Sequence, residues 1–456
     1  MDIGKLKVVY FLGIGGIGMS ALARYLNKAG KMVHGYDKTP TLLTAELEAE
    51  GMKIHYDDRP DLIPDETDLV IYTPAVPTNL GEFRHILEKE YKLMKRSELL
   101  GAITEAKTTL AVAGTHGKTT VTTMLSHILY AGKEGCTSFL GGIAKNYNSN
   151  LLLKPESRFM VAEADEFDRS FLRLFPWLAV ITSADADHLD IYGDHQHLIN
   201  SFADFTANIN EGGFLLVKKG VKIPTQTKNG VTRLIYSVND AADFKAENLR
   251  LEEGIYHFDL KTPGKTVIDL KPGLPGLFNV ENSIAAAAAA WLAGCSDEEI
   301  RYGINTFKGV KRRFDHRINR PGFLYIDDYA HHPEELKACI SSVKALYPQR
   351  HITGIFQPHL YTRTRDFAEG FANSLSMLDR VILLDIYPAR ELPIEGISSS
   401  MLLKNITAPD KQLCTKAEAL ALLSRITPDV LLTLGAGDID QLVAEIEELF
   451  NNKETK

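Results

Sequence analysis

The sequence is poor in cysteine and offers no framework for disulfides or zinc. Its 456 residues include four cysteines, Cys136, Cys295, Cys339 and Cys414, and no two of them form a CxxC pair. Scattered cysteines of this kind are typical of reduced thiols in a protein core. We therefore expect a cytoplasmic protein.

Long apolar runs and an excess of positive charge are also missing. The longest unbroken apolar run, residues 284–293, is about half of what a membrane-spanning helix requires. The apolar patch near the start leads into a glycine cluster, not a cleavage site, so we expect no secretory signal. The 51 Lys and Arg against 59 Asp and Glu give a formal net charge of -8, which argues against a nucleic-acid or anionic-membrane surface. We expect small-molecule partners, no nucleic acid and no membrane insertion.

What the sequence does have is a candidate phosphate-binding turn at residues 108–124, TTLAVAGTHGKTTVTTM. Its apolar first part predicts a buried strand, which breaks at the glycines into a turn that opens a helix. Gly114 and Gly117 let backbone N–H groups turn inward, and the helix N-terminus adds partial positive charge. Lys118 brings a full positive charge, and the hydroxyl of Thr119 can ligate the Mg²⁺ of a nucleoside triphosphate.

The turn is a shortened variant of the general phosphate-loop pattern. Val112 stands where that pattern has a glycine six residues before the lysine. The alternative for so short a match is a glycine-containing strand-to-helix turn with a solvated lysine. The other motifs of the chain favour the phosphate-binding interpretation.

The first hundred residues predict a βαβ unit with a second glycine turn. The expected elements are a strand at 7–12, a helix at 19–29 and a strand at 32–37. Between the first two lies GIGGIG at 13–18, which fits GxGxxG, and Asp37 follows where a carboxylate meets a ribose hydroxyl in dinucleotide folds. Because a glycine turn at a helix N-terminus serves any diphosphate, the pattern predicts a nucleotide diphosphate more securely than NAD. Arg96 is a further candidate phosphate ligand.

Two expected strands of the middle region end in acidic clusters. The strand at 158–162 leads into EADEFD, and the strand at 178–182 leads into DADHLD. Ligands of open parallel sheets bind outside the carboxyl ends of the strands, so both clusters should face the crevice that holds Lys118. Mg²⁺ prefers one or two carboxylates with phosphate oxygens and waters, and Glu163 with His188 could supply the protein ligands.

The second half of the chain contains further polar positions of interest. Residues 213–269 predict short strands that form a β-rich part of the central domain. Asn279 and Asn282 open an alanine-rich helix, where they suit either helix capping or contact with a nucleotide base. A third α/β unit follows, in which the paired Arg363 and Arg365 suit carboxylate or phosphate recognition.

Seven motifs occur in order along the whole chain: GIGGIGMSALA, AGTHGKTT, EADEFD, DADHLD, RRF, DDYAHHP and QPHLYTRTRD. Together they resemble the muramyl (Mur) ligases of bacterial peptidoglycan synthesis. The resemblance implies an α/β protein of three domains. These are a Rossmann-like N-terminal domain that binds a UDP-sugar (1–104), a central P-loop ATPase sheet with a β-rich part (105–312) and a Rossmann-like C-terminal domain that closes over ATP and the amino acid (313–456).

The resemblance also implies roles for the residues that match the family's motifs. The UDP-sugar would be held by Gly15, Gly16, Ile17, Gly18, Asp37 and Arg96. ATP would be held by Gly114, Thr115, His116, Gly117, Lys118, Thr119, Thr120, Asn279, Asn282, Arg313 and Asp328. Two Mg²⁺ ions are expected, the first on Thr119 and Glu163 and the second on His188. The catalytic set would be Lys118, Glu163, His188, Arg313, His331 and Arg363.

The reaction that the resemblance implies joins L-alanine to the lactyl carboxylate of UDP-N-acetylmuramate, with ATP forming an acyl phosphate. One alternative is a recycling ligase of the same family that adds a tripeptide, although QPHLYTRTRD and YPARELPIEG favour the alanine reaction. A nicotinamide-dependent dehydrogenase would leave Lys118, Glu163 and His188 unexplained, and a non-catalytic nucleotide sensor need not keep them intact. A monomer and a homodimer are both compatible with the sequence. Phe278 and Leu360 depart from the family pattern, which commonly has histidine and arginine there.

A lysine that is absent generates a first prediction. Several sibling muramyl ligases carbamylate a lysine shortly after the metal-binding histidine, but this chain has no lysine between Lys154 and Lys218. Its activity should therefore be insensitive to bicarbonate, whether waters or Asp204 complete the second metal site. The measurement is the turnover rate in CO₂-depleted buffer before and after bicarbonate is added. A several-fold recovery would contradict the prediction.

Overall fold

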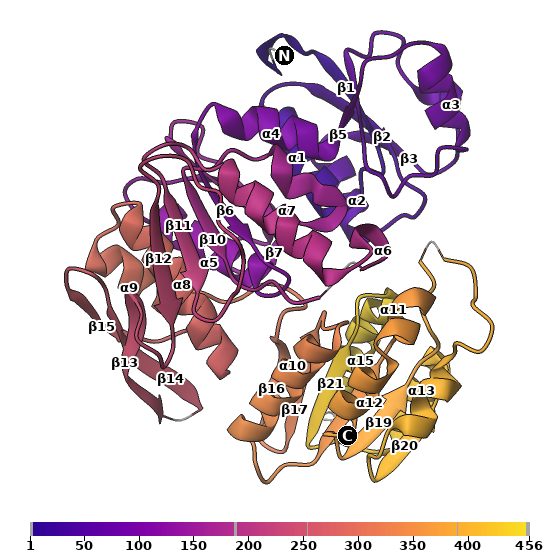
Figure 1. Ribbon diagram of the computed structural model, residues 1–456. Helices are drawn as coiled ribbons and strands as arrows, with labels where there is room; N and C mark the ends of the chain where they lie inside the picture. Colours follow the sequence, from indigo (N-terminus) through magenta and orange to yellow (C-terminus); the bar gives the residue numbers. More distant parts are fainter. Residues whose placement is uncertain (1–2, 187–188, 253, 390, 453–456) are drawn as a thin grey trace. The chain divides into compact units, whose positions relative to one another are not determined.

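The structure is a computed structural model that describes residues 3–186, 189–252, 254–389 and 391–452 (Figure 1). It contains three β-sheets with accompanying helices, which confirms the expected α/β fold of three domains. The chain divides into two compact units. The first unit comprises residues 1–250, 257–273 and 281–308 and holds the first two sheets, and the second comprises residues 251–256, 274–280 and 309–456 and holds the third.

The first sheet forms the N-terminal domain. The elements of this domain are η1 (Ile3–Lys5), β1 (Val8–Leu12), α1 (Ile17–Lys28), β2 (Met32–Tyr36), α2 (Leu42–Ala49), β3 (Lys53–His55), η2 (Pro60–Leu62), β4 (Leu69–Tyr72), α3 (Gly81–Glu88), β5 (Leu93–Lys95) and α4 (Arg96–Glu105). The strands run parallel in the order β3-β2-β1-β4-β5. All residues of β1 (VVYFL) are buried, as expected for a central strand covered on both faces. The turn after β1 lies where the strand order reverses, the usual ligand position in such sheets.

The first helix begins earlier than predicted. We expected its start at residue 19, but α1 begins at Ile17 and places Gly18 in its first turn. The reason is that Gly16 is the extended N-cap residue (φ -62°, ψ 142°), and the amide of Ser20 already donates to the Gly16 carbonyl at 2.8 Å. The glycine turn itself is therefore only four residues long, from 13 to 16.

The second sheet forms the central domain. The elements of this region are β6 (Thr108–Ala113), α5 (Lys118–Ala131), β7 (Thr137–Ala144), β8 (Ser149–Leu152), β9 (Phe159–Ala164), η3 (Phe167–Arg173), β10 (Leu178–Ile181), α6 (Leu189–Tyr192), α7 (His195–Ala207), β11 (Phe214–Lys218), β12 (Thr232–Ser237), β13 (Phe244–Glu252), β14 (Ile255–Lys261), β15 (Thr266–Leu270), α8 (Leu277–Leu292) and α9 (Asp297–Thr306). The sheet order is β15-β14-β13-β12-β11-β10-β6-β9-β7-β8. The strands expected in the β-rich part thus continue the same sheet as the phosphate turn.

Three parallel strands of this sheet end level with one another. Ala113 of β6 is in register with Ala164 of β9 and with Ile181 of β10. The phosphate turn and both acidic segments therefore leave the sheet at one edge, as predicted. One detail of the prediction is wrong: β9 continues past residue 162, so Glu163 lies within the strand, paired in register with Val112.

A buried polar contact joins the first two domains. Helix α1 packs against β7 and β8, and there the guanidinium of Arg24 donates to Asn150 Oδ1 at 2.6 Å. The same guanidinium donates to Glu46 at 2.9 Å and to Glu50 at 2.8 Å. Asn150 in turn donates to the carbonyl of Ile17 at 2.7 Å. Because these buried groups satisfy one another, the N-terminal helix is held on the central sheet in one arrangement.

The third sheet forms the C-terminal domain in the second unit. Its elements are β16 (Asp315–Arg320), β17 (Phe323–Asp328), α10 (Pro333–Leu346), β18 (Ile352–Phe356), α11 (Tyr361–Asp366), α12 (Ala368–Leu375), β19 (Arg380–Leu383), α13 (Ser399–Asn405), β20 (Asp410–Leu413), α14 (Lys416–Arg425), β21 (Val430–Leu434), η4 (Asp438–Asp440) and α15 (Gln441–Asn452). The order is β16-β17-β21-β18-β19-β20, with only β16 antiparallel. Phe367 (φ -116°, ψ 18°) separates α11 from α12.

The described residues agree with two expectations drawn from absences. All four cysteines are buried free thiols. Within the part of the chain that the structure describes, no helix is both long and apolar enough to cross a membrane.

His127 joins three elements of the central domain and makes stability depend on pH. This buried side chain of α5 has its Nδ1 2.7 Å from the Tyr147 hydroxyl, between β7 and β8, and its Nε2 2.9 Å from Thr306 Oγ1 on α9. Burial lowers the pKa of His127 from 6.5 to about 4. Between these two pH values, His127 therefore binds a proton in the unfolded chain but stays neutral in the folded chain.

We expect this histidine to cost the protein stability as the pH falls from about 6.5 to about 4, because only the unfolded state gains the proton in that window. The measurement is the urea-denaturation midpoint of the wild type and of His127→Gln across that range. The difference in denaturation midpoint between the wild type and His127→Gln should become smaller, or change sign, toward pH 4. His351→Gln, which changes an exposed histidine, is the matched control and should keep the wild-type slope. A gap that stays constant with pH would contradict the prediction.

Candidate functional site

The predicted phosphate turn lies between β6 and α5 and has the left-handed backbone that its glycines allow. Gly114 has φ +133° and Gly117 has φ +82°. A Cβ atom on Gly114 would lie 2.2 Å from Thr182 Oγ1, and one on Gly117 would lie 2.8 Å from Asn282 Oδ1. Both positions therefore require glycine for conformation and for space.

The end of β10 holds this turn in place. Thr115 Oγ1 lies 2.9 Å from Ser183 Oγ, and the His116 amide donates to Ser183 Oγ at 2.7 Å. Thr182 Oγ1 donates to the carbonyl of His116 at 2.5 Å. The first amides of α5 have no acceptor within the helix and carry its partial positive charge. This arrangement can bind a polyphosphate.

Lys118 is paired with a carboxylate that the sequence did not single out. Its Nζ donates to Glu166 Oε1 at 2.8 Å and to the Thr115 carbonyl at 3.4 Å. The Glu166 side chain is fully buried, and that of Lys118 is 12% exposed. Burial alone would lower the pKa of Lys118, but the charges of Glu166, Asp165 and Glu163 outweigh burial and raise it. Lys118 is therefore a permanent cation at the turn.

Glu163 and Thr119 are the described candidates for a metal site beside this lysine. A Cβ atom on Gly141 of β7 would lie 2.1 Å from Glu163 Oε2, so glycine at position 141 makes room for the carboxylate. Thr119 and Thr120 are buried in the first turn of α5. A carboxylate and a hydroxyl are hard oxygen donors that suit Mg²⁺ when phosphate oxygens and waters complete the shell.

His188, the ligand predicted for the second metal ion, lies outside the described residues. Among the residues that are described, no group of three or more His, Cys, Asp and Glu side chains is arranged to hold a metal ion. A site built from Thr119 and Glu163 would therefore depend on oxygens of the bound nucleotide. The donor set fits an ion that arrives with phosphate.

The residues predicted for the UDP-sugar lie together at the start of α1: Gly15, Gly16, Ile17, Gly18, Asp37 and Arg96. Asp37 Oδ2 accepts from the Gly15 amide at 2.8 Å. Arg96, the first residue of α4, lies against Gly18, where a Cβ atom would be 2.8 Å from Arg96 Nη1. The glycine thus lets the guanidinium approach the helix start, and a diphosphate there would meet amides and an arginine.

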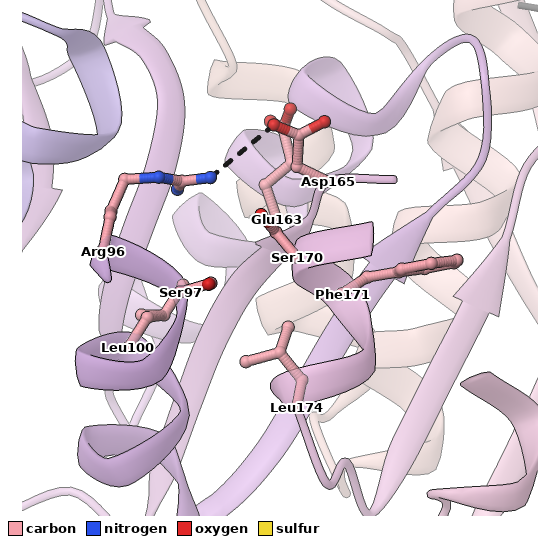
Figure 2. A pocket seen from close by; sticks show the side chains of 8 residues that line it. All are labelled: Arg96, Ser97, Leu100, Glu163, Asp165, Ser170, Phe171 and Leu174. Atoms are coloured by element: carbon pink, nitrogen blue, oxygen red, sulfur yellow. Dashed lines mark ion pairs between the residues drawn. The ribbon is translucent and has the colours of Figure 1, made fainter. Parts of the chain in front are cut away.

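A small pocket separates Arg96 from the acidic segment that follows β9. Figure 2 shows the Arg96 guanidinium pointing toward Asp165, with 3.7 Å between Nη2 and Oδ2. The pocket is lined by Arg96, Ser97, Leu100, Glu163, Asp165, Ser170, Phe171 and Leu174. Lys95 also reaches this segment, with its Nζ 3.6 Å from Asp168.

One acidic segment, residues 163–168, therefore faces the cations of both candidate nucleotide sites. Asp165 lies near Arg96, and Glu166 binds Lys118. We predicted Glu163 from EADEFD and missed Glu166. The available signal was the presence of several acids after one strand, but their spacing does not reveal which cation each of them meets.

The second unit places Arg313 and Asp328 close together. Asp328, the last residue of β17, accepts from the amides of Phe314 at 2.6 Å and Ala330 at 2.7 Å. Burial raises the pKa of Asp328 to about 6, against the lowering effects of Arg313 and these amides. The Arg313 guanidinium lies 4.9 Å from the centre of the Tyr329 ring.

His331 and Arg363 belong to neighbouring segments of the same unit. His331 Nδ1 lies 2.9 Å from the Tyr329 carbonyl and 3.2 Å from Glu335 Oε2. Arg363 is buried on α11, whose N-cap residue is Leu360 with φ +69°. Leu360, one of the two departures from the family pattern, is itself buried, so its side chain contributes to packing.

The two asparagines before the alanine run lie in different units. Asn279, in the second unit, is buried and donates from Nδ2 to the Pro275 carbonyl at 2.7 Å. Asn282, in the first unit, directs Oδ1 at Gly117 of the phosphate turn. Phe278, the other departure, packs edge-on against Phe314 with ring centres 5.6 Å apart.

Comparison with known proteins gives a consistent result along the chain. The model "Mur ligase family, catalytic domain" matches residues 8–108, "Mur ligase middle domain" matches 112–290, and "Mur ligase, glutamate ligase domain" matches 312–437. UDP-N-acetylmuramate--L-alanine ligase of Parabacteroides distasonis is 52% identical in an alignment of 455 residues that covers 98% of this chain and 98% of its own. The chain belongs to the Mur ligase family. The boundaries that we predict for its domains are not fixed by these matches.

Further similar proteins extend the comparison. The enzyme of the same name from Phocaeicola vulgatus is 49% identical and covers 99% of this chain and 100% of its own. The crystal structure of UDP-N-acetylmuramate-alanine ligase MurC from Thermotoga maritima has a TM-score of 0.83 at 26% identity, covering 98% of this chain and 100% of that chain. A murein peptide ligase from Psychrobacter arcticus, at 21% identity, has a TM-score of 0.69 over 97% and 98% and shares the fold.

Replacing a turn glycine tests whether residues 114–117 form the nucleotide site. Gly117→Ala adds a Cβ atom at the Asn282 amide oxygen and strains the left-handed backbone. We expect Mg·ADP binding, measured by calorimetry, to weaken at least about tenfold, because about 1 kcal/mol of backbone strain adds to the contact.

Gly220→Ala is the matched control for this substitution. Gly220 has a similar left-handed backbone (φ +91°), but an added Cβ atom would meet nothing within 4 Å. It should lose comparable stability and keep its affinity for Mg·ADP. Equal binding by the two folded variants would place the nucleotide elsewhere.

Proposed function

We infer that this protein is an ATP-dependent amide-bond ligase that joins L-alanine to the lactyl carboxylate of UDP-N-acetylmuramate. The observation that carries this inference is the 52% identity, along nearly the whole of both chains, to a UDP-N-acetylmuramate--L-alanine ligase. The buried Lys118 of the phosphate turn, with Glu163 on the neighbouring strand, supports an enzyme that uses ATP.

In this reaction ATP activates a carboxylate that is otherwise unreactive. A carboxylate does not react with an amine at neutral pH, so the lactyl carboxylate first takes the γ-phosphoryl group of ATP and ADP departs. The uncharged amine of L-alanine then attacks the acyl phosphate, loses a proton, and expels inorganic phosphate as the amide forms. Phosphoryl transfer depends chiefly on alignment and on neutralising the charge of the transferring group.

The first unit supplies the groups for both nucleotides. Lys118 and the amides of the turn would bind the ATP phosphates, and Thr119 with Glu163 would hold Mg²⁺. When bound, that ion supplies positive charge to the phosphate oxygens. We place the second expected ion on His188.

The UDP-sugar belongs at the first glycine turn. The amides of Gly15, Gly16, Ile17 and Gly18 mark the start of α1, where a diphosphate is favoured by the helix charge. The guanidinium of Arg96 would donate two hydrogen bonds to oxygens of the diphosphate, and Asp37 would lie toward the ribose hydroxyls. Saturable binding of UDP-N-acetylmuramate, and not of NAD, is the behaviour this arrangement supports.

The second unit supplies the remaining groups. Arg313 would contact the ATP phosphates and Asp328 the ribose, while His331 and Arg363 would face the reacting substrates. Asn279 of this unit would lie at the adenine, together with Asn282 of the first unit. A domain that carries Arg313, Asp328, His331 and Arg363 can complete the site and keep water from the acyl phosphate.

Two other functions have less support. The likeness to a murein peptide ligase shows the fold alone, so addition of a tripeptide rests on no residue-level observation here. A dehydrogenase would leave Lys118, Glu163 and His188 unexplained. The four buried free thiols support a cytoplasmic location.

The test is phosphate release from ATP with UDP-N-acetylmuramate present, adding L-alanine, a tripeptide or NAD in turn. Release should require L-alanine and yield UDP-N-acetylmuramoyl-L-alanine by mass spectrometry. Lys118→Ala should lower kcat by at least about 10³, because loss of a transition-state charge contact costs several kcal/mol. Turnover with tripeptide alone would favour the recycling reaction, and near-normal turnover in folded Lys118→Ala would overturn the assignment of the turn.

A further inference from the structure

The pair between Lys118 and Glu166 has no part in the reaction described above. The ammonium that should meet the ATP phosphates is 2.8 Å from a fully buried carboxylate. Glu166 comes from the segment after β9, 48 residues away in sequence. The contact therefore depends on the fold of the central domain.

The backbone of Glu166 is fixed while its side chain reaches Lys118. Its carbonyl accepts from the Tyr192 hydroxyl at 2.7 Å and from the Arg169 amide at 2.9 Å. Asp168 and Arg169 follow with left-handed backbone angles, φ 53° and 55°, which non-glycine residues seldom adopt. This turn brings the Arg169 amide back to the Glu166 carbonyl and so fixes the backbone that carries the carboxylate.

The charges explain what such a contact does. A carboxylate and a phosphate oxygen are both anions that accept hydrogen bonds from the same ammonium. With Lys118 in place on Glu166, an arriving polyphosphate competes with a bond that is already made. Molecules in which Glu166 holds the lysine away from the ligand do not bind it fully. The apparent affinity for the polyphosphate therefore falls in proportion to the fraction of such molecules.

We propose that Glu166 is the positioning residue of Lys118: it holds the ammonium at the turn when no nucleotide is bound and yields it to the phosphates when ATP arrives. The proposal rests on the proposed function in one respect, namely that the ligand of the turn is ATP. Glu166 keeps the ammonium of Lys118 charged and close to the phosphate turn. The affinity for nucleotide is reduced because the carboxylate competes with the phosphates for this ammonium.

The test compares Mg·ATP binding by calorimetry in the wild type and in Glu166→Gln, with the sugar substrate and L-alanine left out. Glutamine keeps the size of the side chain but removes the competing charge. We expect binding about three- to tenfold tighter, since the fraction of lysine available to phosphate rises. Glu166→Asp, with a shorter reach to the ammonium, should lie between the two and serves if the glutamine variant does not fold.

Two controls separate positioning from a general effect of charge or structure. Asp168→Asn removes a negative charge from the same segment, where Asp168 pairs with the half-exposed Lys95, and should bind within twofold of wild type. In a Lys118→Ala background, Glu166→Gln should give a smaller gain than in the wild-type background, because no lysine remains to be released.

The outcomes distinguish this proposal from the proposed function. Unchanged or weaker Mg·ATP binding in folded Glu166→Gln, or an equal gain in Asp168→Asn, overturns the positioning role while the ligase assignment stands. A wild-type chain that binds no Mg·ATP and releases no phosphate in the ligase assay overturns the proposed function itself.

Discussion

The candidate site depends on the parallel register of three strands. Because β6, β9 and β10 end level with one another, the phosphate turn, the acidic segment and the hydroxyls of Thr182 and Ser183 meet at one edge. A shift of one residue in β9 would turn Glu163 to the other face of the sheet and remove it from this edge. The same register allows Gly141 to make room for its carboxylate.

Ion pairs with residues 163–168 are a second feature of this edge. Lys118 and Arg96, the cations proposed for two different nucleotides, both face carboxylates of residues 163–168 in the protein by itself. The two contacts differ in strength. The pair with Glu166 is buried at 2.8 Å, whereas the pair of Arg96 with Asp165 is partly exposed at 3.7 Å and is screened by solvent. The contact of this segment with Lys118 is therefore firmer than its contact with Arg96.

The division into units follows the proposed chemistry. Arg24 and Asn150 tie the N-terminal helix to the central sheet, so both phosphate-binding turns lie in one compact unit. Arg313, Asp328, His331 and Arg363 belong to the other unit. The residues proposed for the reaction are therefore divided between the two units.

Local features of the fold could be predicted from the order of residues alone. The apolar runs predicted β6, β9 and β10, and the glycine spacing predicted both turns, because strand and turn preferences depend on neighbouring residues. Helix α10 begins at Pro333, which suits a first helical position. Seven motifs in order were enough to predict the family that the comparisons established.

Only the tertiary structure decided which side chains meet. That Glu166 holds Lys118, that Gly141 makes room for Glu163 and that the β-rich part continues the central sheet follow from strand order and register. The start of α1 at Ile17 and the break at Phe367 likewise depend on backbone geometry that composition does not reveal. The physical reason is that these contacts join distant residues, and a sequence pattern records spacing along the chain, not the path that the chain takes through space.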